Sequence, residues 1–211
     1  MEKQRWNPGA LLAPVPAVLV SCGTAEAPNL LTVAWTGIVC SQPATTYISL
    51  RPERHSYGII RESGEFVINL TTKDMVRAVD FCGVRSGRDT DKFARCGLTP
   101  EAAEPLRCPA VGESPVQLLC KVTQVLPLGS HDMFLARIVG VQVDPALLDG
   151  QGKLHLDRAN LLAYAHGEYF ALGEKLGSFG YSVRKKPAGK RRGGNGKGRG
   201  KAPLPKGKRE N

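Results

Sequence analysis

The segment from Val116 to Val125 alternates apolar and polar side chains. Val116, Leu118, Cys120 and Val122 hold one set of positions, and Gln117, Lys121 and Thr123 lie between them. A period of two places successive side chains on opposite faces of a β-strand, so this pattern predicts a strand. The segment from Met133 to Val143 is its predicted partner, and a turn at Leu128-Gly129-Ser130 joins the two into an antiparallel hairpin.

Further short apolar runs predict more strands of the same kind. They are bounded by glycine, proline or asparagine and cover Ala17–Cys22, Leu30–Cys40, Thr45–Leu50 and Glu65–Leu70. Five or more strands joined mostly as antiparallel hairpins indicate a mainly β fold, a small antiparallel β-barrel with a few short helices. No GxGxxG follows a strand, which argues against a Rossmann dinucleotide domain.

Three short helices are expected between the strands. Ser56 to Glu62 has helical spacing, with Gly64 as a left-handed terminator. Thr71 to Cys82 predicts one amphipathic helix that begins with a Thr71/Asp74 capping box and ends at Gly83. The stretch from Val84 to Gly97 predicts a polar loop followed by a short helix.

The last part of the chain differs sharply in composition from the rest. Residues 184–211 contain 12 Lys/Arg and one acidic residue, a net charge of +11, whereas residues 1–183 carry −1. Such a segment has little to bury, so we predict a folded domain over 1–183 and a disordered basic tail over 184–211. The tail could bind a polyanion such as RNA or DNA, or it could serve only solubility.

The cysteines and the apolar runs bear on the compartment. Six cysteines are scattered without a CxxC pair, and no signal peptide or run of about 20 apolar residues is present, so we expect reduced thiols, the cytoplasm and no membrane span. Cys22, Cys40 and Cys120 fall in apolar strands and are expected to be buried. No spacing of a zinc site or of a Ser/His/Asp triad is present.

Two polar clusters could bind an anionic ligand. Arg51–Gly58 (RPERHSYG) joins a strand to a helix start, where free N–H groups and arginine side chains suit a phosphate. Ser86–Phe93 (SGRDTDKF) again offers glycine, cations and donors near a helix start. Each cluster alone is equally consistent with a solvated loop.

Three further residues lie in a strand that is otherwise apolar. Asn29, Thr32 and Trp35 could line a ring system rich in acceptors, or they could satisfy turn backbone and fill the core. His131 lies in the turn of the long hairpin, where it could face a ligand or only solvent.

Taken together, these segments resemble the flavin reductase-like family of FMN-binding split barrels, particularly its flavoredoxin branch. The matching blocks are Pro28–Leu70 (PNLLTVAWTGIVCSQPATTYISLRPERHSYGIIRESGEFVINL), Asp80–Pro100, Gly129–Asp144 and Leu172–Val183. The resemblance lies in the combination and order of the blocks and covers nearly all of the chain except the tail. It implies a six-stranded antiparallel barrel, usually a homodimer, with one FMN per subunit near the subunit interface.

The resemblance also implies roles for individual residues. Asn29, Thr32 and Trp35 would lie along the isoalloxazine, Ser49 and Arg51 near the ring edge or ribityl chain, and Arg54, Ser56 and Lys92 near the phosphate. His131 would neighbour the nicotinamide of the electron donor and would position it, because the flavin itself performs the hydride chemistry. The chain departs from many relatives in having Tyr57 where a small hydroxyl residue often follows the serine, and in its basic extension.

The function implied is an oxidoreductase. FMN would take a hydride from NADH or NADPH and pass electrons to free flavin, a partner protein or a small acceptor. An alternative is a flavoredoxin-type electron carrier that keeps FMN but has no nicotinamide site of its own. A further alternative is polyanion binding through the basic tail.

Overall fold

The computed structural model describes residues 1–184. The chain divides into two compact units, residues 1–174 and 175–211. All the strands and helices that follow belong to the first unit, except the 3₁₀ turn η4 (Tyr181–Val183) in the second. The prediction of a disordered basic tail concerns residues that, apart from Arg184, lie outside the described part.

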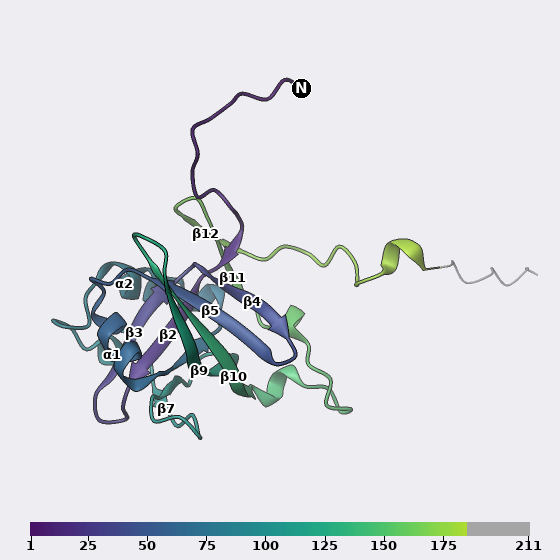
Figure 1. Cartoon of the computed structure of the whole chain (residues 1–211). Helices are drawn as coiled ribbons and strands as arrows, with labels where there is room; N and C mark the ends of the chain where they lie inside the picture. The colour runs from purple at the N-terminus through teal and green to yellow at the C-terminus, as the bar shows by residue number, and fades with distance from the viewer. Residues whose placement is uncertain (185–211) are drawn as a thin grey trace, which may run out of the picture. The chain divides into compact units, whose positions relative to one another are not determined.

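An antiparallel sheet of seven strands forms the main body, in the order β3-β2-β6-β9-β10-β5-β4 (Figure 1). Its strands are β2 (Val18–Gly23), β3 (Pro28–Val33), β4 (Thr36–Ser41), β5 (Ala44–Leu50), β6 (Glu65–Asn69), β9 (Val116–Pro127) and β10 (Asp132–Val143). A three-stranded sheet contains β1 (Val15–Pro16), β11 (Leu162–Ala165) and β12 (Glu168–Ala171), and β7 (Pro100–Glu101) pairs with β8 (Ala110–Val111). The expectation of a mainly β antiparallel fold is confirmed.

The connection between β3 and β4 closes this sheet. The two strands lie at opposite edges, yet only Ala34 and Trp35 separate them in sequence. Two residues reach only about 7 Å, so the sheet has to curl until its edges meet. The Trp35 carbonyl accepts a hydrogen bond from the Ser49 amide of β5 at 2.9 Å, which holds this corner in place.

The expectation of one continuous strand over Leu30–Cys40 is therefore wrong. Its first half pairs with β2 and its second half with β5, because the chain bends at Ala34-Trp35 to cross from one sheet edge to the other. The Thr36 hydroxyl donates to the Tyr47 carbonyl at 2.5 Å and fixes the start of β4. The sheet consequently has seven strands where six were expected.

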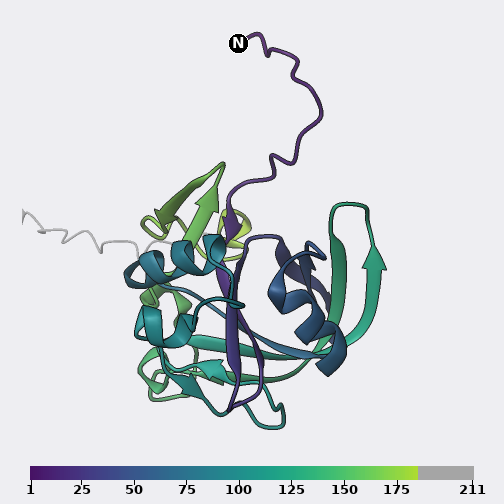
Figure 2. The ribbon, with the colours of Figure 1, turned by 90° about the vertical axis from the view of Figure 1, so that its left-hand side faces the viewer.

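The long hairpin forms as predicted. Val116 pairs with Val143 at its open end and Pro127 with Asp132 near its turn. Gly129 adopts φ 103°, a conformation that favours glycine, so the turn falls where the sequence places it. The hairpin tip lies beside α1 (His55–Ser63) in Figure 2.

The first helix also agrees with its prediction. α1 ends at Gly64, which has φ 70° and donates its N–H to the Ile60 carbonyl. Tyr57 and Ile60 of α1 pack into the barrel core. The short helix α3 (Lys92–Cys96) appears where expected and is capped by the Asp91 carboxylate, which accepts from the Ala94 amide at 3.1 Å.

The predicted helix over Thr71–Cys82 differs in the structure. A 3₁₀ turn, η1 (Lys73–Met75), precedes α2 (Val76–Val84), and Gly83 lies inside α2. Thr71 does not cap the helix, because its hydroxyl donates to the Ala17 carbonyl and ties this segment to β1 and β2. The long-range hydrogen bond replaces the local capping box.

Two apolar clusters lie on the two faces of β2. Val18, Val20 and Cys22 face the barrel core with Phe66 and Phe134, while Leu19 packs with α2 and α3. Burial on both faces explains why this strand is apolar throughout instead of alternating. Two further 3₁₀ turns, η2 (Pro145–Leu147) and η3 (Leu156–Arg158), also belong to this unit.

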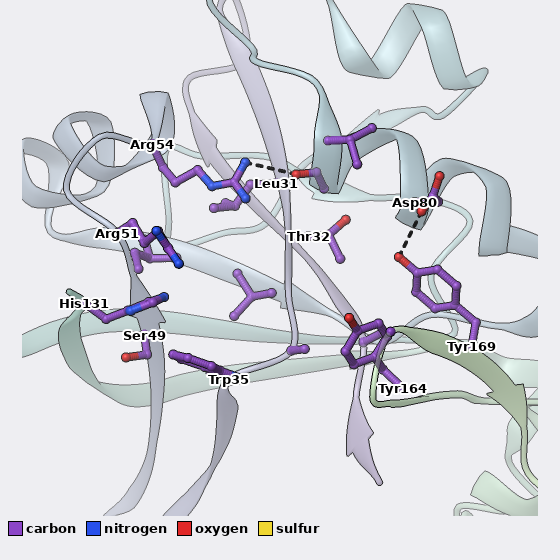
Figure 3. A pocket seen from close by; sticks show the side chains of 17 residues that line it. Leu31, Thr32, Trp35, Ser49, Arg51, Arg54, Asp80, His131, Tyr164 and Tyr169 are labelled. Atoms are coloured by element: carbon purple, nitrogen blue, oxygen red, sulfur yellow. Dashed lines mark hydrogen bonds between the residues drawn. The ribbon is translucent and has the colours of Figure 1, made fainter. Parts of the chain in front are cut away.

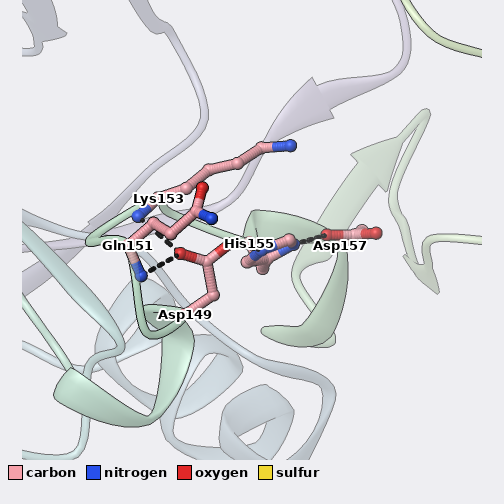
Figure 4. Close-up of polar contacts among 5 residues, drawn as sticks. All are labelled: Asp149, Gln151, Lys153, His155 and Asp157. Atoms are coloured by element: carbon pink, nitrogen blue, oxygen red, sulfur yellow. Dashed lines mark hydrogen bonds and ion pairs between the residues drawn. The ribbon is translucent and has the colours of Figure 1, made fainter.

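A polar cluster closes the loop between η2 and η3 (Figure 4). The Asp149 carboxylate accepts from the amides of Gln151 and Lys153 at 2.9 and 3.0 Å and lies 2.9 Å from His155 Nε2. The hydrogen bond from His155, and then those from the two amides, lower the pKa of Asp149 to about 2. These hydrogen bonds close the loop between η2 and η3, which is a structural role.

Candidate functional site

A cavity of about 370 Å³ lies where the β3–β4 connection meets α2 and the β11–β12 hairpin (Figure 3). At one end, Trp35, Ser49, Arg51, Arg54 and His131 line it, and at the other end Asp80, Tyr164 and Tyr169 do so. Thr32 lies between the two ends. Six residues singled out in the sequence as flavin or donor contacts thus line one cavity: Thr32, Trp35, Ser49, Arg51, Arg54 and His131.

Trp35 and His131 form the floor of the first end. Their ring centroids are 4.4 Å apart with an interplanar angle of 40°. Burial, followed by the positive charge of Arg51, lowers the pKa of His131 below its usual value. His131 is therefore predominantly neutral at neutral pH and can accept a hydrogen bond or stack without adding charge.

A second hollow of about 430 Å³ adjoins the cavity and is strongly basic. It is lined by Arg51, Arg54, His55, Ser56, Arg85, Ser86, Gly87 and Lys92, with one acidic residue, Glu53. Leu31, Arg51, Arg54 and Val84 line both hollows. The two polar clusters predicted from the sequence, Arg51–Gly58 and Ser86–Phe93, therefore face each other across one hollow, here called the basic pocket.

Arg54 is held in place between the two hollows. Its Nη1 donates to the Gly83 carbonyl of α2 at 3.0 Å, which leaves further guanidinium donors free to face a ligand. Both arginines are exposed, but Arg51 makes only an ion pair, 3.6 Å from the Glu53 carboxylate. The geometry makes Arg54 the better ordered of the two cations.

Lys92 is buried, and its ammonium joins three elements. Nζ donates to the carbonyls of Leu30 in β3 at 2.7 Å and of Cys82 in α2 at 2.9 Å. Burial lowers the pKa of Lys92. Two of its three N–H donors are thus used within the fold, and one remains for the basic pocket that Lys92 also lines.

Asn29 is placed differently from the other candidates. It lines neither hollow; instead its Nδ2 donates to Ser56 Oγ at 2.6 Å from behind the basic pocket. Asn29 Oδ1 would lie 1.8 Å from a Cβ at position 87, so the loop can approach only because Gly87 has none. The Ser56 hydroxyl and the Gly87 backbone are therefore fixed relative to each other by Asn29.

Thr32 also uses its hydroxyl in a hydrogen bond within the fold. Its side chain lines the cavity while its hydroxyl donates to the Val79 carbonyl of α2. Ser49 lies on β5 opposite Met133 of β10, close in the fold to His131. A direct contact of Asn29 with a ring system stays a prediction, as do the contacts of Thr32 and Ser49.

Sequence reasoning missed the far end of the cavity. Tyr164 and Tyr169 have ring centroids 5.4 Å apart, and the Tyr169 hydroxyl donates to Asp80 at 3.3 Å. Burial, and then Asp80, raise the pKa of Tyr169 to about 12. The signal in the sequence was the His166-Gly167 pair, which takes positive φ in a two-residue hairpin turn and brings both tyrosines to one face.

Tyr57 does not occupy the basic pocket. Its ring packs edge-on against Phe134 in the barrel core at 5.2 Å between centroids. Its hydroxyl donates to the Asp132 carboxylate at 2.5 Å. Tyr57 therefore contacts the core and the turn end of the hairpin, and the neighbouring Ser56 lines the pocket.

The cysteines are free thiols with contrasting exposure. Burial raises the pKa of Cys22 to about 11 and of Cys82, Cys108 and Cys120 to about 12. Such thiols are poor nucleophiles. The expectation that Cys40 is buried is wrong, because its side chain lies on the open face of β4, a sheet edge.

Two further features, a metal site and a membrane-spanning helix, are not found in the described residues. Residues 1–184 contain no cluster of three His, Cys, Asp or Glu side chains suited to a metal ion. Over the same residues, no helix is long and apolar enough to cross a membrane.

The two hollows together fit a flat ring that carries a phosphate. The cavity offers aromatic and neutral polar walls, and the basic pocket offers cations, a hydroxyl and a close backbone approach at Gly87. Guanidinium and ammonium groups bind phosphate oxygens strongly when they are partly buried.

Comparison with known proteins agrees with this geometry. A family model described as "Flavin reductase like domain" matches residues 11–173. The flavoredoxin of Desulfovibrio vulgaris (Miyazaki F) is 33% identical, with a TM-score of 0.80 over 87% of this chain and 100% of that chain. An FMN-binding domain of a flavin reductase-like enzyme from Shewanella baltica OS155 is 25% identical, with a TM-score of 0.66 over 77% of this chain and 88% of that chain.

A curated relative adds an activity by name. The NADPH-flavin oxidoreductase of Streptomyces viridifaciens is 26% identical over 144 residues, 66% of this chain and 68% of the relative. The family model spans most of the chain, and the flavoredoxin superposes on the same barrel with more than 30% identity. On both grounds, this chain belongs to the flavin reductase-like family.

Proposed function

We propose that this protein is an FMN-dependent oxidoreductase that passes electrons from NADH or NADPH through bound FMN to an acceptor. The observation that carries the proposal is the direct continuity of the aromatic cavity and the basic pocket, which share Leu31, Arg51, Arg54 and Val84. A ring bearing a phosphate on a short chain matches that pair of hollows, and the Shewanella baltica relative is named as an FMN-binding domain.

In this proposal Arg54, Ser56 and Lys92 hold the phosphate. The Ser56 hydroxyl is oriented by Asn29, and the Lys92 ammonium by two carbonyls, so both are fixed before the ligand arrives. Preorganised donors of this kind bind without a further loss of side-chain freedom. The residues Arg51 and Ser49 continue from the phosphate arm toward the ring.

Trp35 and Thr32 border the ring, and FMN, when bound, supplies the site at which a hydride is accepted. The chain itself orients the two reactants and keeps water away. His131, neutral because of its lowered pKa, packs against Trp35 with the two rings tilted and forms one wall of the space left for a nicotinamide. Its role is positioning, because a neutral imidazole here donates no charge to the reaction.

The acceptor is free flavin, a partner protein or a small molecule. The relative named NADPH-flavin oxidoreductase favours a reductase with its own donor site. The flavoredoxin, which is the more similar of the two, favours a carrier that receives electrons from a partner protein. Turnover of NADH or NADPH separates these two functions.

The protein acts as a homodimer in this proposal. The edge strand β4 exposes Ile38 (65%) and Val39 (51%) to solvent, and β10, which β5 separates from β4 in the sheet, exposes Val141 (54%). Exposed apolar side chains on an edge strand are costly unless they are covered. Trp35, next to β4, is 45% exposed, so a second subunit on this surface would cover the cavity as well.

The basic tail is proposed to bind polyanions independently of the flavin site. Its charge of +11 over residues 184–211, against −1 for the rest, supports binding through counterion release. Deleting residues 184–211 should then abolish binding of single-stranded RNA at low salt and leave flavin binding intact. Equal RNA binding by the shortened protein contradicts the role.

Absorbance spectra test the main proposal. Purified protein is mixed with FMN, separated from free flavin, and treated without oxygen first with NADPH or NADH and then with dithionite. Flavin bands that bleach with a nicotinamide support the reductase, and bands that bleach only with dithionite support the carrier. Failure to retain FMN contradicts both. Arg54→Ala should lose FMN, whereas Arg95→Ala, on the exposed side of α3, should retain it.

A further inference from the structure

The outward face of α2 carries a groove of about 510 Å³ that runs into the cavity. Arg77, Phe81 and Arg85 line only the α2 side of it. Asp80, Val84 and Tyr169 line both the groove and the cavity. The groove and the cavity are therefore adjacent at these shared residues, so a ligand bound at the tyrosine end of the cavity can extend onto α2.

The side chains of the two arginines in this groove do not stabilise the described fold through hydrogen bonds or ion pairs. Unlike Arg54, whose guanidinium donates to Gly83, the side chains of Arg77 and Arg85 make no hydrogen bond or ion pair with any residue in 1–184. Both are exposed and flank the half-buried ring of Phe81. The acidic residue between them, Asp80, already accepts the Tyr169 hydroxyl.

Two free guanidinium groups beside an aromatic ring suit a nucleotide. A guanidinium fork binds phosphate oxygens in pairs, and a half-buried phenyl ring offers a face to a flat base. The groove borders the basic pocket at Val84 and Arg85, whereas Arg77 and Phe81 line the groove and not the basic pocket.

We propose that this groove binds the adenosine end of the electron donor and selects NADPH over NADH, with Arg77 contacting the 2′-phosphate. The inference rests on the proposed function, in which the nicotinamide end reaches the flavin inside the cavity. Arg85 lines the basic pocket as well as the groove, so Arg77 is the residue that distinguishes the donor from FMN. The hydride moves from donor to flavin as before; the groove adds affinity and selectivity.

Direct binding tests the groove without any turnover. FMN-loaded protein is titrated calorimetrically with 2′,5′-ADP and with 5′-AMP. The wild type should bind 2′,5′-ADP about tenfold more tightly, and Arg77→Ala should remove about that factor, the effect of one charged hydrogen-bonded contact. The matched control is Arg95→Ala, an exposed arginine on α3 that lines neither the groove nor the cavity. Equal affinity of Arg77→Ala and wild type for 2′,5′-ADP overturns the proposal.

Kinetics separate this inference from the proposed function. In Arg77→Ala, kcat/KM for NADPH should fall about tenfold while that for NADH is unchanged, and Arg77→Lys should restore part of the loss. If NADPH bleaches the flavin equally well in the wild type and in Arg77→Ala, only the groove assignment is overturned. Failure of both nucleotides to bleach the flavin overturns the proposed function, whereas Arg77-dependent binding of 2′,5′-ADP would still support a nucleotide site on α2.

Discussion

The Tyr57 hydroxyl donates a hydrogen bond of 2.5 Å to the Asp132 carboxylate and thereby joins α1 to the turn end of the long hairpin. Arg61 Nη1 lies 3.3 Å from the same hydroxyl. Asp132 directly follows His131, and Tyr57 directly follows Ser56. One hydrogen bond therefore connects the proposed phosphate contact with the proposed nicotinamide contact.

Replacing Tyr57 by phenylalanine should loosen that connection. The hydroxyl is lost while the ring stays against Phe134, so the free energy of unfolding should fall by about 1–2 kcal/mol, the cost of leaving Asp132 without its partner. Urea denaturation measures this change. Tyr47→Phe is the control, because the Tyr47 hydroxyl has no hydrogen-bond partner in residues 1–184, and an equal loss in both variants would contradict the assignment.

Removing the Lys92 ammonium should destabilise the fold and weaken flavin binding together. Lys92→Met keeps the aliphatic length but leaves the buried carbonyls of Leu30 and Cys82 without their donor, at a cost of about 2–3 kcal/mol. The midpoint of chemical denaturation should fall accordingly, and less FMN should be retained after gel filtration. A variant with unchanged stability would show that the two hydrogen bonds contribute little; Arg95→Met on the same helix is the control.

The loop at Gly87 should not tolerate a side chain. A Cβ there would lie 1.8 Å from Asn29 Oδ1, so Gly87→Ala must displace the loop or the Asn29–Ser56 pair. We expect FMN affinity to fall at least about tenfold, which quenching of flavin fluorescence measures. Gly58→Ala is the matched control: no atom lies within 4 Å of its Cβ, and alanine in a helix should stabilise the protein by about 0.5–1 kcal/mol.

The titration of His131 should be visible in the fluorescence of Trp35, whose ring lies 4.4 Å away. In a Trp6→Phe background Trp35 is the remaining tryptophan of the two, and protonated histidine quenches indole emission. The quenching should have its midpoint below the usual histidine pKa of 6.5. His131→Asn should give a flat profile, and a midpoint above 6.5 would contradict the lowered pKa.

The same shift makes a prediction for stability against pH. The folded pKa of His131 is below its unfolded value, so the unfolded state binds more protons just below pH 6.5. The contribution of His131 to the free energy of unfolding is therefore complete above its pKa in the unfolded state, and it is lost as the pH falls through its pKa in the folded state. Relative to His131→Asn, the wild type should lose stability as the pH falls from 7 toward 5, measured by urea denaturation.

Much of the fold could be predicted because its signals are local. The strand over Val116–Val125, the turn at Gly129 and the terminator at Gly64 each depend on neighbouring residues, and each is present in the structure. Burial along the strand does not alternate, however, because Gln117 and Leu119 are buried as well as Val116 and Cys120. The Thr71 capping box failed for the opposite reason. A hydrogen bond to Ala17, 54 residues away, competes with the cap, and no local pattern reveals it.

The candidate site divides in the same way. The sequence by itself determined the mainly β class, the two basic clusters and a set of residues suited to a flavin, because strand period, turn chemistry and charge are properties of short segments. Only the tertiary structure decided that β3 and β4 bend apart at Trp35, that Asn29 stands behind Ser56, and that Tyr169 and α2 close the cavity. Those contacts join residues far apart in the chain, and they follow from closing the sheet, which no single segment specifies.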